Sequence, residues 1–423
     1  MSSHPATANA QGTRVIKSTP AVGVSYFTPA QNPPSGTASD PQPNGQRPPK
    51  LFQPLTIRGL TFQNRIFLSP LCQYSAEDGH MTAWHMAHLG GIISRGPGLA
   101  IVEATAVSPE GRITPEDVGL WKDSQIEPMA KIVEFARGQN QKIAIQLSHA
   151  GRKASTVAPW LSTGGLAVEE AGGWPNNVCG PSTIAYDGRH AQPHEMTLED
   201  IETLKKAWVA TTRRALKAGF DAIEIHNAHG YLLHSFVSPA SNKRTDAYGG
   251  CFENRIRLTL EIVDLVRVEI PDSMPLFLRI SATDWLEHTG EPSWTLDQTA
   301  ELAKILADKG VDLIDVSSGG LHPAQKIVPG PGFQAPFAKR VREAVAGKAL
   351  VSAIGMITEG KQAQALIDDG SADVVMSGRG FQKNPGLVWA WADDLGVKIY
   401  VANQIGWGFG KATAAGGRGG RRT

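Results

Sequence analysis

Short apolar runs recur through the middle of the chain, separated by segments with the spacing of amphipathic helices. Eight runs are rich in β-branched residues and fit buried strands, at 66–68, 99–102, 143–147, 222–225, 276–280, 313–316, 350–353 and 374–376. Thr197 and Asp200 form a capping box that opens a helix ending at Gly219, and a similar helical pattern spans 295–310. Eight strand–helix units predict a single α/β domain, a (β/α)₈ TIM barrel.

Composition changes along the chain divide it into parts. Residues 1–50 are rich in Pro, Ser, Ala and Gly, which predicts a flexible or surface-wrapping arm. We expect the barrel over 51–400, with 150–196 as a lid insertion after the third strand, because that stretch is full of Gly, Pro, Trp and Asn. Residues 401–423 are expected to form a Gly/Arg-rich tail.

The charge balance indicates a small-molecule partner. Among 423 residues, 41 are basic and 40 acidic, so no overall field attracts nucleic acid or an anionic membrane. No apolar run is long enough to span a membrane. Three cysteines are poor material for a disulfide framework, which favours a reducing, cytoplasmic location. One alternative is an RNA-binding barrel that uses the arginines of residues 411–423.

Three polar rings follow the fourth predicted strand. His226, His229 and Tyr231 come directly after the apolar run at 222–225. Parallel α/β barrels carry their chemistry at the carboxyl ends of the strands. Two imidazoles that can bond one oxygen, with a phenol nearby, indicate a site that activates a carbonyl group. A zinc site is the less favoured reading, since the chain has no H-E-x-x-H or C-x-x-C pattern.

The remaining strand ends predict a phosphorylated cofactor. The loops after the last two strands contain Gly355 and the pair Gly378–Arg379. Loops in these positions of a barrel commonly bind phosphate through backbone N–H groups that glycine leaves accessible. No G-x-G-x-x-G follows a strand, so a separate dinucleotide-binding domain is not expected.

Several longer stretches resemble one family. The stretches are Asn-Arg-Ile-Phe-Leu-Ser-Pro-Leu-Cys-Gln-Tyr (64–74), Val-Glu-Ala-Thr-Ala-Val (102–107), Ile-Gln-Leu-Ser-His-Ala-Gly-Arg (145–152), Glu-Ile-His-Asn-Ala-His-Gly-Tyr-Leu-Leu-His (224–234), Ser-Asn-Lys-Arg-Thr-Asp-Ala-Tyr-Gly-Gly (241–250) and Ala-Ile-Gly-Met-Ile-Thr (353–358). Over roughly residues 50–400 the chain resembles the Old Yellow Enzyme family of flavin-dependent ene-reductases, and within it the thermophilic-like branch.

The resemblance implies an FMN site on the barrel mouth. It places along the flavin ring Ser69, Pro70, Leu71, Cys72 and Ala104. It assigns the pyrimidine edge to Gln146 and Arg279, and the phosphate to Gly355, Gly378 and Arg379. A cation beside the flavin N1 stabilises the negative charge of the reduced ring.

The resemblance also implies an activity. His226 and His229 would hold an oxygen of an activated alkene with help from Tyr74, and Tyr231 would protonate the α-carbon after hydride reaches the β-carbon. The implied substrates are enones, enals, maleimides and nitroalkenes, and NADPH or NADH would donate hydride from the same pocket in ping-pong order. A flavin-dependent oxidation or isomerisation in a biosynthetic pathway remains the alternative.

The chain departs from the family pattern at two positions. Members of this branch often carry, before a C-terminal Gly-Trp pair, an arginine that enters the neighbouring subunit's site. Here Ile405 precedes Gly406 and Trp407, so a homo-oligomer is possible but a shared-site arginine is absent. Lys383 stands where an arginine often supports the phosphate loop.

Overall fold

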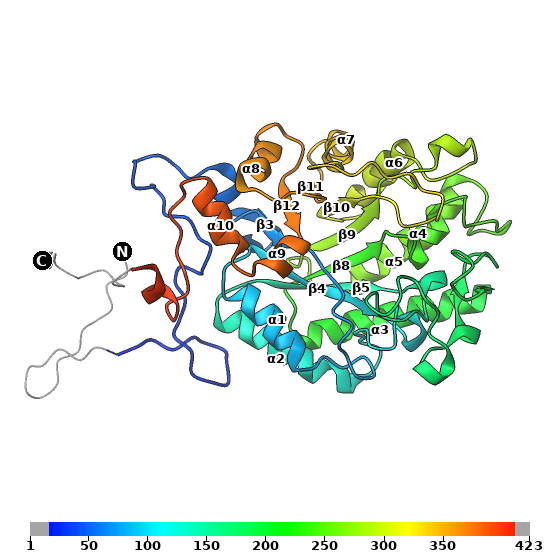
Figure 1. The fold of residues 1–423 in the computed structure, drawn as a ribbon, viewed down its shortest axis with the longest axis horizontal. Coiled ribbons are helices and arrows are strands. Elements are labelled where there is room, and N and C mark those ends of the chain that lie inside the picture. Colours follow the sequence, from blue (N-terminus) through cyan, green and yellow to red (C-terminus); the bar gives the residue numbers. More distant parts are fainter. Residues whose placement is uncertain (1–16, 411–423) are drawn as a thin grey trace, which may run out of the picture.

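Eight parallel strands close into a barrel (Figure 1). The computed structural model describes residues 17–410. Around the barrel the strand order is β10-β11-β12-β3-β4-β5-β8-β9. These strands are β3 (Ile66–Leu68), β4 (Leu99–Ala106), β5 (Ile143–Ser148), β8 (Ala222–Asn227), β9 (Leu276–Ser281), β10 (Leu313–Ser317), β11 (Leu350–Ala353) and β12 (Val374–Ser377). Each contains one of the eight predicted runs, so the prediction of a TIM barrel is confirmed.

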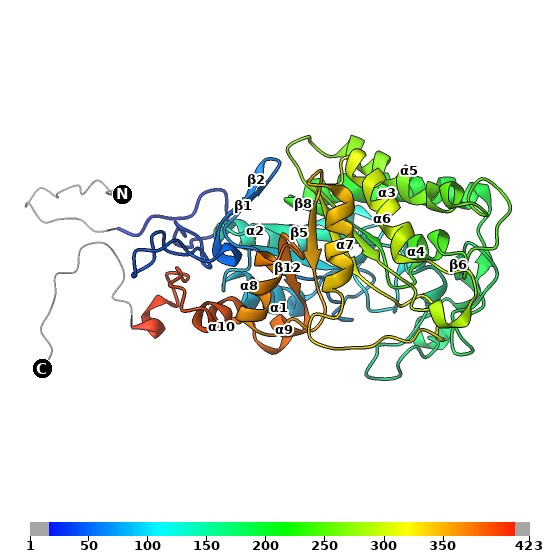
Figure 2. The same cartoon turned by 90° about the horizontal axis from the view of Figure 1, so that it is seen from above.

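Helices alternate with the strands and surround the barrel (Figures 1 and 2). They are α1 (Ala83–Ile93), α2 (Ile126–Gly138), α3 (Leu198–Ala218), α4 (Leu232–Val237), α5 (Phe252–Glu269), α6 (Leu296–Asp308), α7 (Ala335–Val345), α8 (Gly360–Asp368), α9 (Arg379–Lys383) and α10 (Leu387–Asp394). Within the described range, no helix combines the length and the apolar character needed to cross a membrane.

The residues predicted to begin and end α3 are confirmed. Thr197 Oγ1 accepts a hydrogen bond from Asp200 N at 3.1 Å, and Asp200 Oδ2 accepts one from Thr197 N at 2.8 Å. Gly219 ends the helix with φ 91°. α6 ends at Asp308, two residues before the predicted end at Gly310. Lys309 is the C-cap residue, and Gly310, which has a left-handed conformation, follows it.

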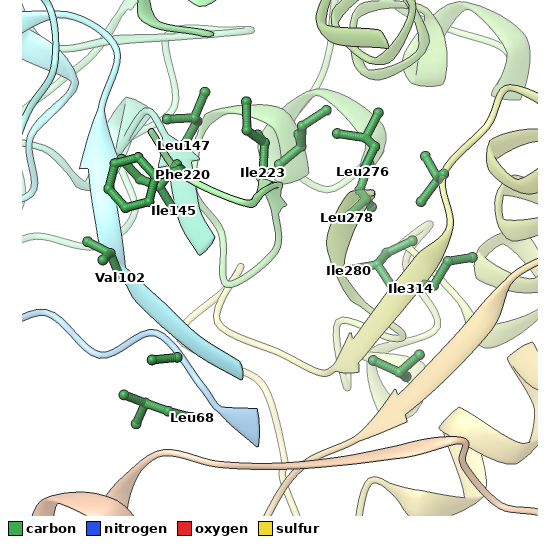
Figure 3. Close-up of a cluster of buried hydrophobic side chains, with 14 of the residues drawn as sticks. Leu68, Val102, Ile145, Leu147, Phe220, Ile223, Leu276, Leu278, Ile280 and Ile314 are labelled. Atoms are coloured by element: carbon green, nitrogen blue, oxygen red, sulfur yellow. The ribbon is translucent and has the colours of Figure 1, made fainter. Parts of the chain in front are cut away.

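Alternate side chains of each barrel strand face opposite ways. Outward-facing residues such as Ile145, Ile223 and Leu278 belong to one buried apolar cluster with the surrounding helices (Figure 3). Inward-facing residues such as Ala144 and Phe277 form a second cluster inside the barrel. The antiparallel hairpin of β1 (Leu55–Ile57) and β2 (Leu60–Phe62) adds Ile57 and Phe62 to this cluster and closes the barrel at the amino ends of its strands.

The inward face changes from apolar to polar toward the carboxyl ends of the strands. One layer above the apolar cluster lie Gln146, Glu224, Arg279, Asp315 and Ser352. Strand register brings them together: Gln146 pairs with Glu224, and Asp315 pairs with both Arg279 and Ser352. The hydrophobic seal is therefore at one end of the barrel, and the ionisable groups are available at the other.

The two ends of the described chain lie side by side at one end of the molecule (Figures 1 and 2). Ala38 forms a bridge with Ile399, and Gln31 Nε2 donates to Gln404 Oε1 at 2.7 Å. Residues 17–49 thus pack along the C-terminal segment. The arginines assigned to a possible RNA-binding tail lie in residues 411–423, outside the described part.

The long segment 150–196 lies at the opposite end of the molecule from the two ends of the described chain, near residues 17 and 410 (Figure 2). It contains short 3₁₀ turns and one small parallel pair, β6 (Cys179–Gly180) with β7 (His194–Glu195). Near its tip, residues 157–165 form a compact turn in which Val157 N donates to Gly165 O at 2.9 Å. The segment is ordered mainly by turns and local hydrogen bonds.

Candidate active site

The three predicted polar rings lie together at the carboxyl end of β8. The His226 and His229 ring centroids are 5.2 Å apart with planes at 87°. The His226 and Tyr231 centroids are 5.0 Å apart with planes at 89°. His226 is the last inward-facing residue of β8, whereas His229 has φ 61° in the turn after it. The left-handed turn brings His229 and Tyr231 back over the strand end.

Hydrogen bonds and burial fix the state of both imidazoles. Ala228 N donates to His226 Nδ1 at 3.2 Å, which leaves the proton of the neutral ring on Nε2. His229 Nε2 lies 2.8 Å from Ser317 Oγ. Burial, and then the Arg279 charge, lower the pKa of both histidines well below the usual value. The pair is therefore neutral near pH 7 and can donate hydrogen bonds without carrying charge.

Tyr231 is held as an acid. It is the N-cap residue of α4, and its backbone places the phenol against His226. Burial, followed by the neighbouring Cys72 and Tyr74, raises the pKa of the phenol well above its usual value. The Lys153 ammonium lies 5.3 Å from the centre of the Tyr231 ring. The phenol keeps its proton over the physiological pH range and can donate it.

The turn that carries His229 is tightly packed. Lys153 Nζ donates to His229 O at 2.9 Å and to Gly320 O at 3.0 Å. His229 N donates to Ser281 Oγ at 2.9 Å. Gly230 has φ 76°, and a Cβ there would lie 2.2 Å from Gly320 O. Only glycine fits at this position, so the site depends on close contact between the loops after β8 and β10.

The segment after β3 forms one side of the mouth. Ser69 N donates to Ser377 O at 3.1 Å, which continues the β3–β12 pairing beyond the strands. Ser69 and Pro70 are buried, while Leu71 and Cys72 are partly exposed. The buried Ser69 Oγ has no hydrogen-bond partner among the described residues. A row of side chains and one unused hydroxyl thus faces the barrel mouth.

A bulge in β4 brings a second element beside this row. The β4–β5 register shifts at Glu103 and Ala104, opposite Gln146. The Ala104 backbone interacts with the Cys72 thiol. Burial, and behind it the Asp117 and Glu103 carboxylates, raise the pKa of the Cys72 thiol well above its usual value. Cys72 is therefore a neutral thiol beside Ala104, and not a thiolate nucleophile.

Tyr74 links the mouth to the long segment 150–196. Its φ of 49° is left-handed, and its ring meets Trp160 edge to face with centroids 5.6 Å apart. Trp160 is 67% exposed, and its ring contact with Tyr74 joins the long segment to the edge of the site. Burial, and then Cys72, raise the pKa of the Tyr74 phenol. Tyr74 remains a neutral hydrogen-bond donor at the edge of the mouth.

The polar layer inside the barrel forms the floor of the mouth. Gln146 Nε2 donates to Glu224 Oε1 at 2.7 Å. Arg279 Nε lies 3.0 Å from Asp315 Oδ2, and both side chains are almost fully buried. No other ion pair or hydrogen bond of the Arg279 guanidinium occurs within residues 17–410. Its remaining N–H groups are therefore available for a ligand above the layer.

The predicted phosphate loops lie next to each other, because β11 and β12 are neighbouring strands. Gly355 has φ 112°, and a Cβ there would lie 2.6 Å from Gln334 Nε2. A Cβ on Gly378 would lie 2.8 Å from Leu71 Cδ1. Arg379 is exposed and makes no hydrogen bond or ion pair with the described residues. Two tight glycine loops and a free guanidinium suit a phosphate group.

These features fit FMN. The site offers a free cation and glycine loops for a phosphate, a buried guanidinium with unused N–H groups for a polar ring edge, and an unpaired buried Ser69 hydroxyl. Within residues 17–410, no group of three or more His, Cys, Asp or Glu side chains could hold a metal ion. The fold and site together define a flavin-binding barrel oxidoreductase.

Comparison with known proteins agrees with this class. The model of the NADH:flavin oxidoreductase / NADH oxidase family matches residues 50–395, and the chain belongs to this family. It is 56% identical over 404 residues to an NADH:flavin oxidoreductase of Gibberella zeae, covering 93% of this chain and 96% of that protein. It is 42% identical over 365 residues to the NADPH dehydrogenase of Bacillus subtilis, covering 85% and 99% of the two chains.

Solved structures give the same result. The Old Yellow Enzyme homologue of Zymomonas mobilis superposes with a TM-score of 0.67 at 27% identity, covering 84% of this chain and 95% of that one. Morphinone reductase superposes with a TM-score of 0.68 at 27% identity, covering 83% and 91%. The expected resemblance to the Old Yellow Enzyme family is confirmed, and with it FMN as cofactor and a reduced nicotinamide as hydride donor.

Sequence reasoning missed several residues of the site. Lys153 and Ser281 fix the His229 turn, and Glu224 lies on the floor beside Gln146. Glu224 could have been found, because residues two apart on a strand share a face and His226 was already a predicted site residue. Lys153 and Ser281 carry no comparable sequence signal, since their roles arise from contacts between distant loops.

Proposed function

We propose that the protein reduces carbon–carbon double bonds activated by a carbonyl or nitro group, such as those of enones, enals, maleimides and nitroalkenes, with NAD(P)H as reductant. The observation that carries this proposal is the end of β8 and the turn after it, which together bear two neutral imidazoles, His226 and His229, and a protonated phenol, Tyr231. Neutral donors polarise an oxygen, and a phenol that stays protonated at physiological pH has a proton to give to a strongly basic carbanion.

Residues from six strands or the loops after them would hold FMN. The ring would lie along Ser69, Pro70, Leu71, Cys72 and Ala104. Gln146 and Arg279 would meet the pyrimidine edge, where the partly satisfied guanidinium offers N–H groups. The phosphate would be bound by Gly355, Gly378 and Arg379. Bound FMN would supply a two-electron carrier that receives hydride from the nicotinamide and gives it to the alkene β-carbon.

The chain's own groups would perform the rest of the reaction. His226 Nε2 and the His229 ring would donate hydrogen bonds to the activating oxygen of the substrate, with Tyr74 beside them. These bonds draw electron density away from the double bond and so favour hydride addition at the β-carbon. Tyr231 would then give its proton to the α-carbon and recover it from solvent.

Reductant and alkene would use one pocket in turn. NADPH or NADH is the proposed donor, because the chain aligns over most of its length with relatives named NADPH dehydrogenase and with one named NADH:flavin oxidoreductase. Sequential use of one pocket gives ping-pong kinetics. A shared pocket also explains how this chain can use a nicotinamide cofactor without a G-x-G-x-x-G motif.

The finer points of organisation are proposed on the same basis. We infer a barrel domain over 51–400, a lid over 150–196, an N-terminal arm over 1–50 and a tail over 401–423. A cytoplasmic location is supported by three free cysteines. Ile405, half-buried before Gly406, supports an active site that takes no arginine from another subunit. No nucleic-acid partner is proposed, since the net formal charge is +1.

An anaerobic rapid-mixing experiment tests the proposal. NADPH should bleach the flavin absorbance of the purified protein, and 2-cyclohexenone should then restore it. Bleaching without recovery would contradict alkene reduction and favour a flavin-dependent oxidation or isomerisation. A protein that takes up no FMN would contradict the whole assignment.

A further inference from the structure

Glu224 lies in the polar layer that forms the floor of the mouth, with no exposed surface. Its Oε1 accepts one hydrogen bond, from Gln146 Nε2 at 2.7 Å. Its Oε2 is buried and has no hydrogen-bond partner among the described residues. A carboxylate in such surroundings loses its hydration and regains only one neutral hydrogen bond. The ionised form of Glu224 is therefore strongly disfavoured.

The charges around Glu224 also disfavour its ionised form. On β9 the Arg279 guanidinium is paired with Asp315 of β10 at 3.0 Å, and Asp315 also accepts a hydrogen bond from Ser352 Oγ at 2.6 Å. On β5 the facing group is the neutral amide of Gln146. One cation thus already has its anion, and an ionised Glu224 would give the layer a net charge of −1.

The pKa of Glu224 follows from these surroundings. Burial, and then the Asp315 carboxylate, raise the pKa of Glu224 to about 8, although Arg279 and Gln146 act in the opposite direction. His226, the next inward residue on the same strand, has a lowered pKa and adds no compensating charge. At neutral pH the layer holds Glu224 as the acid and remains uncharged overall.

We propose that Glu224 sets the charge of the cofactor floor: its carboxyl group stays protonated while FMN is bound, and its ionisation weakens binding of the flavin and most of all of the reduced flavin. The proposal rests on the proposed function, because that places the pyrimidine edge over Gln146, which donates to Glu224, and over Arg279, whose charge acts on Glu224. Reduction by hydride adds negative charge to the bound ring. An ionised Glu224 would repel that charge and reduce the benefit of Arg279.

Two matched variants separate this effect from general damage. Glu224→Gln keeps the shape of the side chain and cannot ionise, so it imitates the protonated acid. Asp221→Asn removes another carboxylate of raised pKa, which is half-buried and accepts from Ile143 N at 2.9 Å just before β8. Asp221 lies at the amino end of the strand, away from the proposed flavin site, and serves as the control.

The first measurement is FMN binding to apoprotein by quenching of flavin fluorescence, from about pH 6 to about pH 10. In the wild type, the Kd for FMN should rise roughly tenfold as the pH passes about 8. Over the same range the midpoint potential of the bound flavin should fall more steeply with pH in the wild type than in Glu224→Gln. Asp221→Asn should behave as the wild type. The same pH dependence in Glu224→Gln and wild type would overturn the role of Glu224.

Infrared spectroscopy reads the proton directly, without flavin or activity. Apoprotein with isotope-labelled glutamate should show a carboxylic-acid C=O band at neutral pH that disappears as the pH passes about 8. The band should be absent from Glu224→Gln. If that variant does not fold, the labelled wild type alone decides, because only carboxylate bands at pH 7 would overturn the proposal. A protein that binds no FMN would instead overturn the proposed function.

Discussion

The Tyr231 phenol meets the His226 imidazole edge to face, with ring centroids 5.0 Å apart and planes at 89°. The two residues lie on opposite sides of a left-handed turn at His229 and Gly230. The contact sets the proton donor beside the oxygen-binding ring without a hydrogen bond between them. Each group therefore keeps its own proton for the substrate.

Loss of the histidine pair should impair alkene binding more than flavin reduction. His226→Ala should raise the apparent Kd for 2-cyclohexenone in the oxidative half-reaction by roughly 10- to 100-fold, because one charge-free hydrogen bond to the substrate oxygen is lost. His226→Asn retains a donor and should recover part of the affinity. Unchanged enone affinity in His226→Ala would contradict the assigned contact.

The same histidines predict the acid stability of the protein. Their folded-state pKa values are lowered, so the unfolded chain binds more protons as the pH falls below the ordinary histidine value. Their contribution is present above about pH 6.5 and is lost as the pH falls toward the folded-state pKa. Denaturant unfolding should show stability dropping by on the order of 1–2 kcal/mol per histidine over this range. The double variant His226→Asn/His229→Asn should show a shallower drop.

Gly230 should tolerate no side chain. Gly230→Ala meets both a left-handed φ of 76° and a backbone oxygen 2.2 Å from the new Cβ. We expect a loss of about 2–4 kcal/mol in unfolding free energy together with slower alkene reduction. Gly250→Ala is the control, because Gly250 has φ 81° and nothing within 4 Å of a Cβ. Equal losses in the two variants would show that backbone strain alone, and not loop contact, matters at Gly230.

Arg379 should distinguish FMN from riboflavin. The exposed guanidinium has no partner among residues 17–410, so Arg379→Ala should leave the fold intact. FMN binding should weaken by roughly 10- to 100-fold, since one charge-assisted contact to phosphate is lost. Riboflavin, which lacks the phosphate, should bind wild type and variant alike. Equal weakening for both flavins would place Arg379 away from the phosphate.

Much of this architecture could be predicted from sequence because its signals are local. Each barrel strand is a short β-branched run, and the Thr197–Asp200 box and Gly219 mark the ends of α3 by local hydrogen bonds and a positive φ. The hairpin at 55–62 was missed, because its strands are three residues each and its role depends on sealing the distant barrel interior.

The site residues also differ in whether local sequence could predict them. His226, His229 and Tyr231 are five residues apart at most and could be read from one stretch of sequence. Gln146 and Arg279 of the floor were predicted from the family resemblance. The protonation of Glu224 could not be predicted, because it depends on burial inside the closed barrel and on Asp315, a residue of a distant strand. Tyr74 was predicted, but its contact with Trp160 joins segments whose proximity no local pattern encodes.

The most direct test compares both half-reactions in Tyr231→Phe and wild type by anaerobic rapid mixing. The variant keeps the ring packed against His226 and removes only the hydroxyl. We predict that flavin reduction by NADPH stays within about twofold of wild type, whereas reoxidation by 2-cyclohexenone slows by roughly 100-fold or more. Equal slowing of both steps, or no slowing of reoxidation, would contradict Tyr231 as the proton donor.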